Sequence, residues 1–124
     1  MAKKILVVDD SRTVRQQLEA VLSEAGYEVV QASDGFEGAE TISAIRDLAL
    51  VICDLNMPTM SGIDMLQLVK QEPRNADLFI LMLTTEDQPA MMARAKAAGA
   101  KGWIVKPFKP DLLLATVRKL AGAA

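Results

Sequence analysis

Residues 48–54 read Leu-Ala-Leu-Val-Ile-Cys-Asp, a short apolar run that ends in a carboxylate. A run that is apolar throughout, rather than alternating with polar residues, is typical of a strand buried on both faces of a parallel sheet. Comparable runs occur at residues 5–8, 27–30, 78–83 and 103–105. Their short lengths and the turn residues around them predict strands rather than buried helices, and therefore a sheet of five strands.

The stretches between these runs have the spacing of amphipathic helices. Ser11 suits the N-cap position of the first helix, and Gly26 follows it as a stop signal. Further helices are expected at residues 36–45, 63–71, 90–98 and 111–120, with Pro89 and Pro110 at positions where a helix can begin. A β-α unit repeated five times predicts a doubly wound α/β fold, in which helices cover both faces of a parallel sheet.

Composition narrows the class of protein. A length of 124 residues predicts one domain, spanning 1–124, and a net charge of −2 without a basic stripe argues against nucleic-acid binding. The apolar run at 5–8 is too short for a secretory signal or a membrane span, so a cytoplasmic protein is expected. The single cysteine, Cys53, is expected to be a small buried hydrophobe. The absence of histidine excludes Ser-His-Asp and Cys-His catalysis and histidine metal ligands.

Polar residues with complementary chemistry follow four of the five predicted strands. Asp9 and Asp10 follow the first, Asp54 the third, Thr84 the fourth and Lys106 the fifth. Ligands of an open α/β sheet bind outside the carboxyl ends of its strands, so these side chains are expected around one crevice.

Three carboxylates held together repel one another, and each like-charge pair at 4 Å costs roughly 4 kcal/mol at an effective dielectric of 20. A cation relieves this repulsion, and oxygen ligands with room for water suit Mg²⁺. A divalent ion and the Lys106 ammonium beside an accessible carboxylate describe a phosphoryl-acceptor site, where Thr84 can hydrogen-bond the new group.

The motifs at these strand ends resemble those of the receiver domains of two-component response regulators. They are Ile5-Leu-Val-Val-Asp-Asp10, Asp54-Leu-Asn-Met-Pro-Thr-Met-Ser-Gly62, Leu83-Thr84 and Lys106-Pro107-Phe108. The resemblance covers the chain from Lys4 to about Leu120. The run 99–108, Gly-Ala-Lys-Gly-Trp-Ile-Val-Lys-Pro-Phe, is similar to the stand-alone chemotaxis regulators in particular. The family implies a flavodoxin-like sheet with strand order 2-1-3-4-5, an order that general accounts of the fold illustrate with a chemotaxis receiver.

The resemblance also implies the roles of the site residues. Asp54 would accept a phosphoryl group from a histidine kinase, and Asp10, Asp54 and the Asn56 carbonyl would bind Mg²⁺, with Asp9 acting mostly through water. Lys106 would pair with the phosphoryl group, and its peptide bond to Pro107 would be cis. Met57-Pro58 and Gly62 would shape the loop that follows the acceptor.

Signal output is implied in the same way. Thr84 would be the switch hydroxyl and Trp103 the rotating aromatic that remodels a partner-binding face. A monomer that binds a downstream protein, such as a flagellar motor switch, is expected. Asn56 and Glu86 would tune the lifetime of the aspartyl phosphate, for which decay in minutes is expected. Two residues depart from the family pattern: Trp103 is larger than the usual rotating aromatic, and Thr85 stands next to the switch hydroxyl where the family often has a small residue.

Other functions compete with this one. Asp9 and Asp10 taken alone could cap a helix, and Trp103 taken alone could be a core residue or a partly exposed surface residue. An aspartyl phosphatase of the haloacid-dehalogenase type also places an aspartate after an apolar strand, but Asn56 replaces its second aspartate. A flavin binder would share the fold, but the chain lacks a Ser/Thr-rich phosphate loop after the first strand. Within the receiver class, a phosphorelay intermediate is the main alternative to a chemotaxis or motility regulator.

Overall fold

A computed structural model describes residues 2–85 and 89–124. The described residues form a parallel five-stranded sheet in the order β2-β1-β3-β4-β5, as predicted from the family resemblance. The strands are β1 (Lys4–Val8), β2 (Glu28–Ala32), β3 (Leu48–Asp54), β4 (Ile80–Thr84) and β5 (Gly102–Val105). The sheet is therefore doubly wound, and the carboxyl ends of all its strands lie along the same edge.

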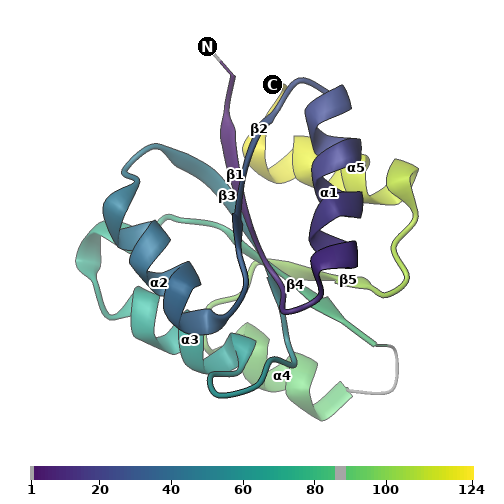
Figure 1. The fold of residues 1–124 in the computed structure, drawn as a ribbon. Helices are drawn as coiled ribbons and strands as arrows, with labels where there is room; N and C mark the ends of the chain where they lie inside the picture. The colour runs from purple at the N-terminus through teal and green to yellow at the C-terminus, as the bar shows by residue number, and fades with distance from the viewer. Residues whose placement is uncertain (1, 86–88) are drawn as a thin grey trace.

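Helices cover both faces of the sheet (Figure 1). They are α1 (Arg12–Glu24), α2 (Gly35–Ala44), α3 (Gly62–Lys70), α4 (Pro89–Ala97) and α5 (Pro110–Ala121), with a short 3₁₀ helix, η1 (Pro73–Asn75). The helices α1 and α5 lie on one face, and α2, α3 and α4 lie on the other. This is the arrangement that the five β-α repeats predict.

Two apolar cores result, one on each face. Alternate residues of the central strands point to opposite faces, so Ile52 packs with Leu18 and Leu113 while Val51 packs with Ile63 and other residues of α2 and α3. Cys53 belongs to the second core and is 0% exposed, as expected for a small buried hydrophobe. Strands buried on both faces explain why the sequence runs are apolar throughout.

The start of β2 differs from the prediction. Tyr27 was expected in the strand, but it belongs to the motif that ends α1, where Gly26 adopts a φ of 99° and the Tyr27 amide donates to the Leu22 carbonyl. Such a left-handed turn after a helix favours glycine because it has no Cβ. The strand instead continues to Ala32, whose carbonyl accepts from the Asp9 amide.

The segment before β4 also differs from the prediction. Residues 78 and 79 were expected in the strand, which begins at Ile80. Leu78 is held in a turn, because its amide donates to the Asn75 carbonyl and its own carbonyl accepts from Lys70 Nζ at 2.6 Å. Lys70 Nζ donates to the carbonyls of Asn75 and Ala76 as well. These contacts hold η1 in place, a 3₁₀ helix that no sequence pattern predicted.

The two ends of the chain meet beside β1 and α5, at the edge of the sheet opposite to the carboxyl ends of the strands (Figure 1). Lys3 Nζ donates to the Ala121 carbonyl at 2.6 Å, and the Tyr27 hydroxyl donates to the Gly122 carbonyl at 2.5 Å. Lysine at this position satisfies a carbonyl that the helix end leaves unpaired. Among the helices of the described residues, none has the length and apolar character needed to cross a bilayer.

Candidate functional site

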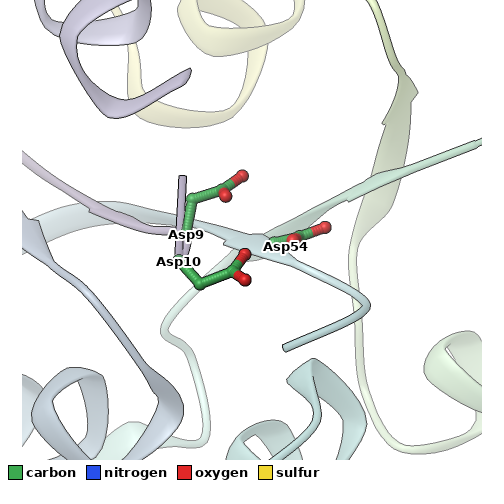
Figure 2. A group of neighbouring side chains, drawn as sticks. All are labelled: Asp9, Asp10 and Asp54. Atoms are coloured by element: carbon green, nitrogen blue, oxygen red, sulfur yellow. The ribbon is translucent and has the colours of Figure 1, made fainter. Parts of the chain in front are cut away.

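The ends of β1 and β3 bring three carboxylates together. One oxygen each from Asp9, Asp10 and Asp54 lies within 4.8 Å of the others. Asp9 and Asp54 are buried, at 0% and 5% exposed, whereas Asp10 is exposed. Figure 2 shows the three side chains gathered where β1 and β3 end, with the Asp10 carboxylate directed toward Asp54. The cluster that the sequence predicted is therefore present.

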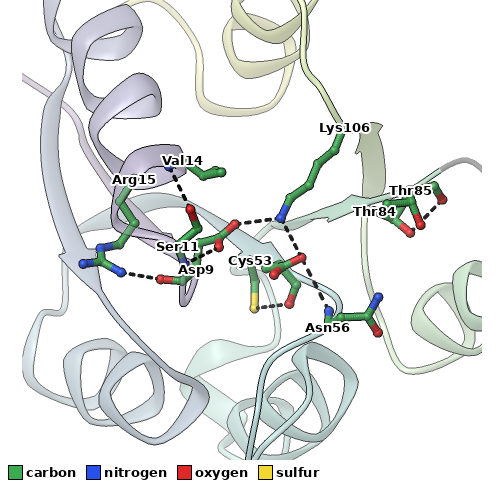
Figure 3. A network of polar contacts seen from close by, with 10 residues as sticks. Asp9, Ser11, Val14, Arg15, Cys53, Asn56, Thr84, Thr85 and Lys106 are labelled. Atoms are coloured by element: carbon green, nitrogen blue, oxygen red, sulfur yellow. Dashed lines mark hydrogen bonds and ion pairs between the residues drawn. The ribbon is translucent and has the colours of Figure 1, made fainter.

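Lys106 bridges two of these carboxylates. It follows β5, and its Nζ lies 3.0 Å from Asp9 Oδ2 and 3.1 Å from Asp54 Oδ1 (Figure 3). The peptide bond to Pro107 is cis, as the family resemblance implies. One ammonium thus supplies a counter-charge to two buried acids, while the three carboxylates together carry more charge than this one ammonium.

Asp9 is fixed through its main chain and its side chain. Its amide donates to the Ala32 carbonyl at 3.1 Å, and its Oδ1 accepts from the Ser11 amide at 2.9 Å. Asp9 Oδ2 is buried and forms an ion pair with Lys106. This oxygen accepts no hydrogen bond from any described residue. This oxygen retains acceptor capacity that a buried polar atom normally uses.

The charges of the site shift its pKa values. Burial raises the pKa of Asp54, and the Asp9 carboxylate raises it further, against the opposing effect of Lys106. Burial lowers the pKa of Lys106, but its short contact with Asp9 and the charges of Asp54 and Asp9 outweigh burial, so the net pKa is raised. Burial and the Asp54 charge also raise the pKa of the Cys53 thiol, which is therefore not a thiolate nucleophile.

The residues of the cluster fit a hard divalent cation. The donor atoms are oxygens, one buried oxygen has unused acceptor capacity, and the cluster carries more negative than positive charge. The exposure of Asp10 leaves room for water ligands, which Mg²⁺ normally keeps. The acidic cluster can thus hold a metal ion.

The remaining predicted site residues lie around the cluster. The Asn56 amide donates to Asp54 Oδ1 at 3.4 Å, so this residue lies against the acceptor. Thr84 is buried at the end of β4, and its hydroxyl donates to the Thr85 carbonyl at 3.2 Å. The structure places Thr85 at the surface. Glu86, predicted to tune the lifetime, lies outside the described residues.

Trp103 is 40% exposed on the edge strand β5, and its register partner is Met82. Val105 pairs with Thr84 and is 38% exposed. Residues two apart on a strand point to the same face, so Trp103 and Val105 share one side of β5. Trp103 is therefore not a core residue in this structure, and the strand neighbour of Thr84 on β5 is Val105 rather than Trp103.

Gly62 allows the start of α3 to pack closely against the end of β3, after the acceptor Asp54. A Cβ at this position would lie 2.2 Å from the Asp54 carbonyl oxygen, a distance that no real contact allows. The Gly62 amide also donates to the Leu55 carbonyl at 3.0 Å. Glycine therefore lets α3 begin directly beneath the acceptor strand.

Arg15 is a site neighbour that the sequence analysis missed. Its Nη1 donates to the Asp9 carbonyl at 2.6 Å from near the start of α1 (Figure 3). The only sequence signal is its helical spacing behind Ser11, which is shared by many surface arginines. Ser11 itself caps α1 by accepting from the Val14 amide, so the alternative in which Asp9 and Asp10 serve as the helix cap is not needed.

Known proteins share both the fold and the motifs. The family model described as the response regulator receiver domain matches residues 5–118. Chemotaxis protein CheY1 of Helicobacter pylori is 42% identical over 111 residues, which cover 89% of this chain and 90% of that protein. Chemotaxis protein CheY of Thermotoga maritima is 35% identical, over 98% of this chain and 99% of that protein. The structure of chemotaxis protein CheY4 of Vibrio cholerae aligns with a TM-score of 0.91 at 41% identity, over 97% of this chain and 99% of that one.

The doubly wound sheet and its acid-lysine site define a signalling module of the phosphoacceptor class. The chain belongs to the response regulator receiver domain family, and its curated relatives of similar length include CheY chemotaxis proteins. Phosphorylation-based signalling fits the site described above.

Proposed function

We propose that this chain is a single-domain response regulator, residues 1–124, that accepts a phosphoryl group on Asp54 in a Mg²⁺-dependent reaction. The observation that carries the proposal is the pairing of Asp54 with both a carboxylate cluster and Lys106. Asp9, Asp10, Asp54 and the Asn56 carbonyl would hold Mg²⁺, which neutralises phosphoryl oxygens when bound. Its expected donor is a phosphohistidine of a histidine kinase.

The transfer uses the free oxygen of Asp54. Among the described residues, the hydrogen bond and the ion pair of Asp54 both use Oδ1, which leaves Oδ2 to attack phosphorus. The new O–P bond forms as the N–P bond of the phosphohistidine breaks, and the imidazole leaves and takes up a proton from water. Lys106 stabilises the charge that gathers on the phosphoryl oxygens. Water hydrolyses the acyl phosphate later, and we propose that the site assists this step as well.

The signal passes to a partner protein that binds a surface changed by phosphorylation. The phosphoryl group adds a charge of roughly −1.5 to −2 to this edge of the sheet. Thr84 and Lys106 follow the new group, and the face formed by α4, β5 and α5 changes with them. That face exposes large apolar side chains, namely Trp103, Val105 and Leu112. The relatives named as chemotaxis proteins favour a cytoplasmic role in chemotaxis or motility, with a motor-switch protein as partner, over a phosphorelay intermediate.

The test is labelling with a small-molecule phosphodonor in the presence of Mg²⁺. Intact mass spectrometry is expected to show one added phosphoryl group that is labile to base. The variant Asp54→Asn should not label, whereas the control Asp64→Asn, which changes an exposed aspartate of α3, should label like the wild type. Labelling of Asp54→Asn at the wild-type rate, or labelling that persists in excess chelator, would overturn the proposal.

A further inference from the structure

A polar chain runs from the surface of α1 to the main chain of the site. Arg15 Nη1 donates to the Asp9 carbonyl at 2.6 Å, and Arg15 Nε donates to Gln31 Oε1 at 3.0 Å. Gln31 Nε2 in turn donates to Glu19 Oε1 at 2.9 Å. Arg15, Gln31 and Glu19 are all half-buried, so these contacts are partly shielded from competing water. The guanidinium is thereby held at two points, by a β2 side chain and by the end of β1.

We propose that Arg15 is a positioning residue for the metal-binding carboxylates. The carbonyl that it binds belongs to the planar peptide unit joining Asp9 to Asp10, so fixing this oxygen fixes the plane from which both side chains extend. Gln31 and Glu19 fix the guanidinium in turn. The inference rests on the proposed function, because it concerns Mg²⁺ binding at the same site.

Two physical effects of Arg15 on a bound cation have opposite signs. Its positive charge lies close to the acidic cluster and by Coulomb's law alone weakens the binding of Mg²⁺. Its hydrogen bond orients the ligands, and the loss of such an outer contact typically costs 10-fold to 100-fold in metal affinity. The sign of the change on removing Arg15 therefore separates positioning from charge.

The decisive measurement is the Mg²⁺ affinity of Arg15→Gln by isothermal titration calorimetry at fixed ionic strength. We expect binding to weaken by roughly tenfold or more, although a positive charge has been removed. The matched control is Arg12→Gln, which removes the same charge from an exposed residue at the start of the same helix. Its Mg²⁺ affinity is expected to equal that of the wild type or to exceed it slightly.

A second variant keeps the charge and changes only the support. Gln31→Leu leaves Arg15 in place but removes its side-chain partner. We expect its Mg²⁺ affinity to lie between the affinity of Arg12→Gln and the lower affinity of Arg15→Gln. Thermal unfolding without metal tests whether each variant is folded. If Arg15→Gln does not fold, the Mg²⁺ affinity of Gln31→Leu decides the question. The amide chemical shift of Asp10 without metal is expected to move further in both variants than in Arg12→Gln.

The outcomes separate this inference from the proposed function. Wild-type protein that neither binds Mg²⁺ nor becomes phosphorylated would remove the proposed function and this inference with it. Wild-type binding with unchanged or tighter binding in folded Arg15→Gln would overturn the positioning role alone, because charge would then account for the whole effect.

Discussion

Asp54 carries its charge where water is nearly excluded and another carboxylate lies close by. Burial and Asp9 raise its pKa, so the folded chain holds a proton on Asp54 more tightly than the unfolded chain does. The tighter hold on this proton stabilises the folded state at pH values below the pKa that Asp54 has in the unfolded chain. The stabilisation is lost as the pH rises through the pKa of Asp54 in the folded chain. At neutral pH without metal, Asp54→Asn is therefore expected to raise the free energy of unfolding, and the gain should shrink as the pH falls.

Urea unfolding at a series of pH values, in the presence of a chelator, measures this dependence. The exposed control Asp64→Asn is expected to show no gain at neutral pH, because this side chain lies outside the cluster. A gain for Asp54→Asn that is constant with pH, or a loss of stability at neutral pH, would contradict the prediction.

Lys106 competes with a metal for the same carboxylates, since its Nζ lies 3.0 Å from Asp9 Oδ2. Lys106→Met keeps an apolar stem of similar length and removes the charge. The free energy of unfolding without metal should fall by about 2–3 kcal/mol, because two buried acids lose their counter-ion. Mg²⁺ should then bind more tightly than to the wild type and restore part of this stability. Calorimetry that shows equal or weaker Mg²⁺ binding would argue against direct competition.

At the residue scale, the sequence predicted those site members that stand at strand ends. Asp9, Asp54 and Lys106 could be found because the carboxyl ends of parallel strands share one edge, whatever the details of packing. Arg15 could not, because its role depends on a contact between a side chain and a main-chain carbonyl six residues away, which no residue pattern encodes. The structure places Asp9, Asp54 and Lys106 together, but the roles of all the predicted site residues, these three included, remain predictions.

At the element scale, the turn between β3 and α3 contains a strained residue. Thr59 has a φ of 67°, a left-handed conformation that is unfavourable for a β-branched side chain. Thr59→Gly is expected to raise the free energy of unfolding by about 1 kcal/mol, since the steric cost of this conformation disappears. Chemical denaturation measures it, and the same replacement at Thr13 inside α1 should lower stability instead. A loss of stability in Thr59→Gly would mean that the threonine side chain stabilises the turn by more than its strain.

The elements themselves could be predicted where apolar runs and helix signals coincide, as they do for α1 and β3. The errors lie at ends that tertiary contacts decide. Tyr27 continues an apolar run in sequence, yet the turn after α1 and a hydrogen bond to Gly122 remove it from β2. Leu78 likewise leaves β4 because Lys70 binds its carbonyl, and periodicity carries no information about such a partner.

At the scale of the whole molecule, Trp103 offers a direct optical reading of the switch. It is the only tryptophan and is 40% exposed without a phosphoryl group. Beryllofluoride with Mg²⁺, a mimic of the phosphorylated state, is expected to bury the ring and shift its emission to the blue. Thr84→Ala should reduce the shift, because Thr84 is buried at the end of β4, the strand that lies between the acceptor strand β3 and the tryptophan strand β5.

Two observations together would contradict this output route. They are an emission spectrum that is identical in both states, and an affinity for a downstream partner that ignores phosphorylation. Asp54→Asn serves as the control and should show no response to beryllofluoride. Because coupling is reciprocal, a partner that prefers the active face must also favour phosphorylation of Asp54.

The meeting of the two chain ends makes the order of the elements along the chain partly arbitrary. Lys3 and Ala121 are in direct contact, so a short linker could join the two ends of the chain without crossing the surface of the domain. New ends could then be opened between the exposed residues Arg46 and Asp47, ahead of β3. In such a circular permutant the acceptor strand would be the first element made, and Asp9 and Lys106 would arrive after it, yet the completed sheet would hold the same neighbours.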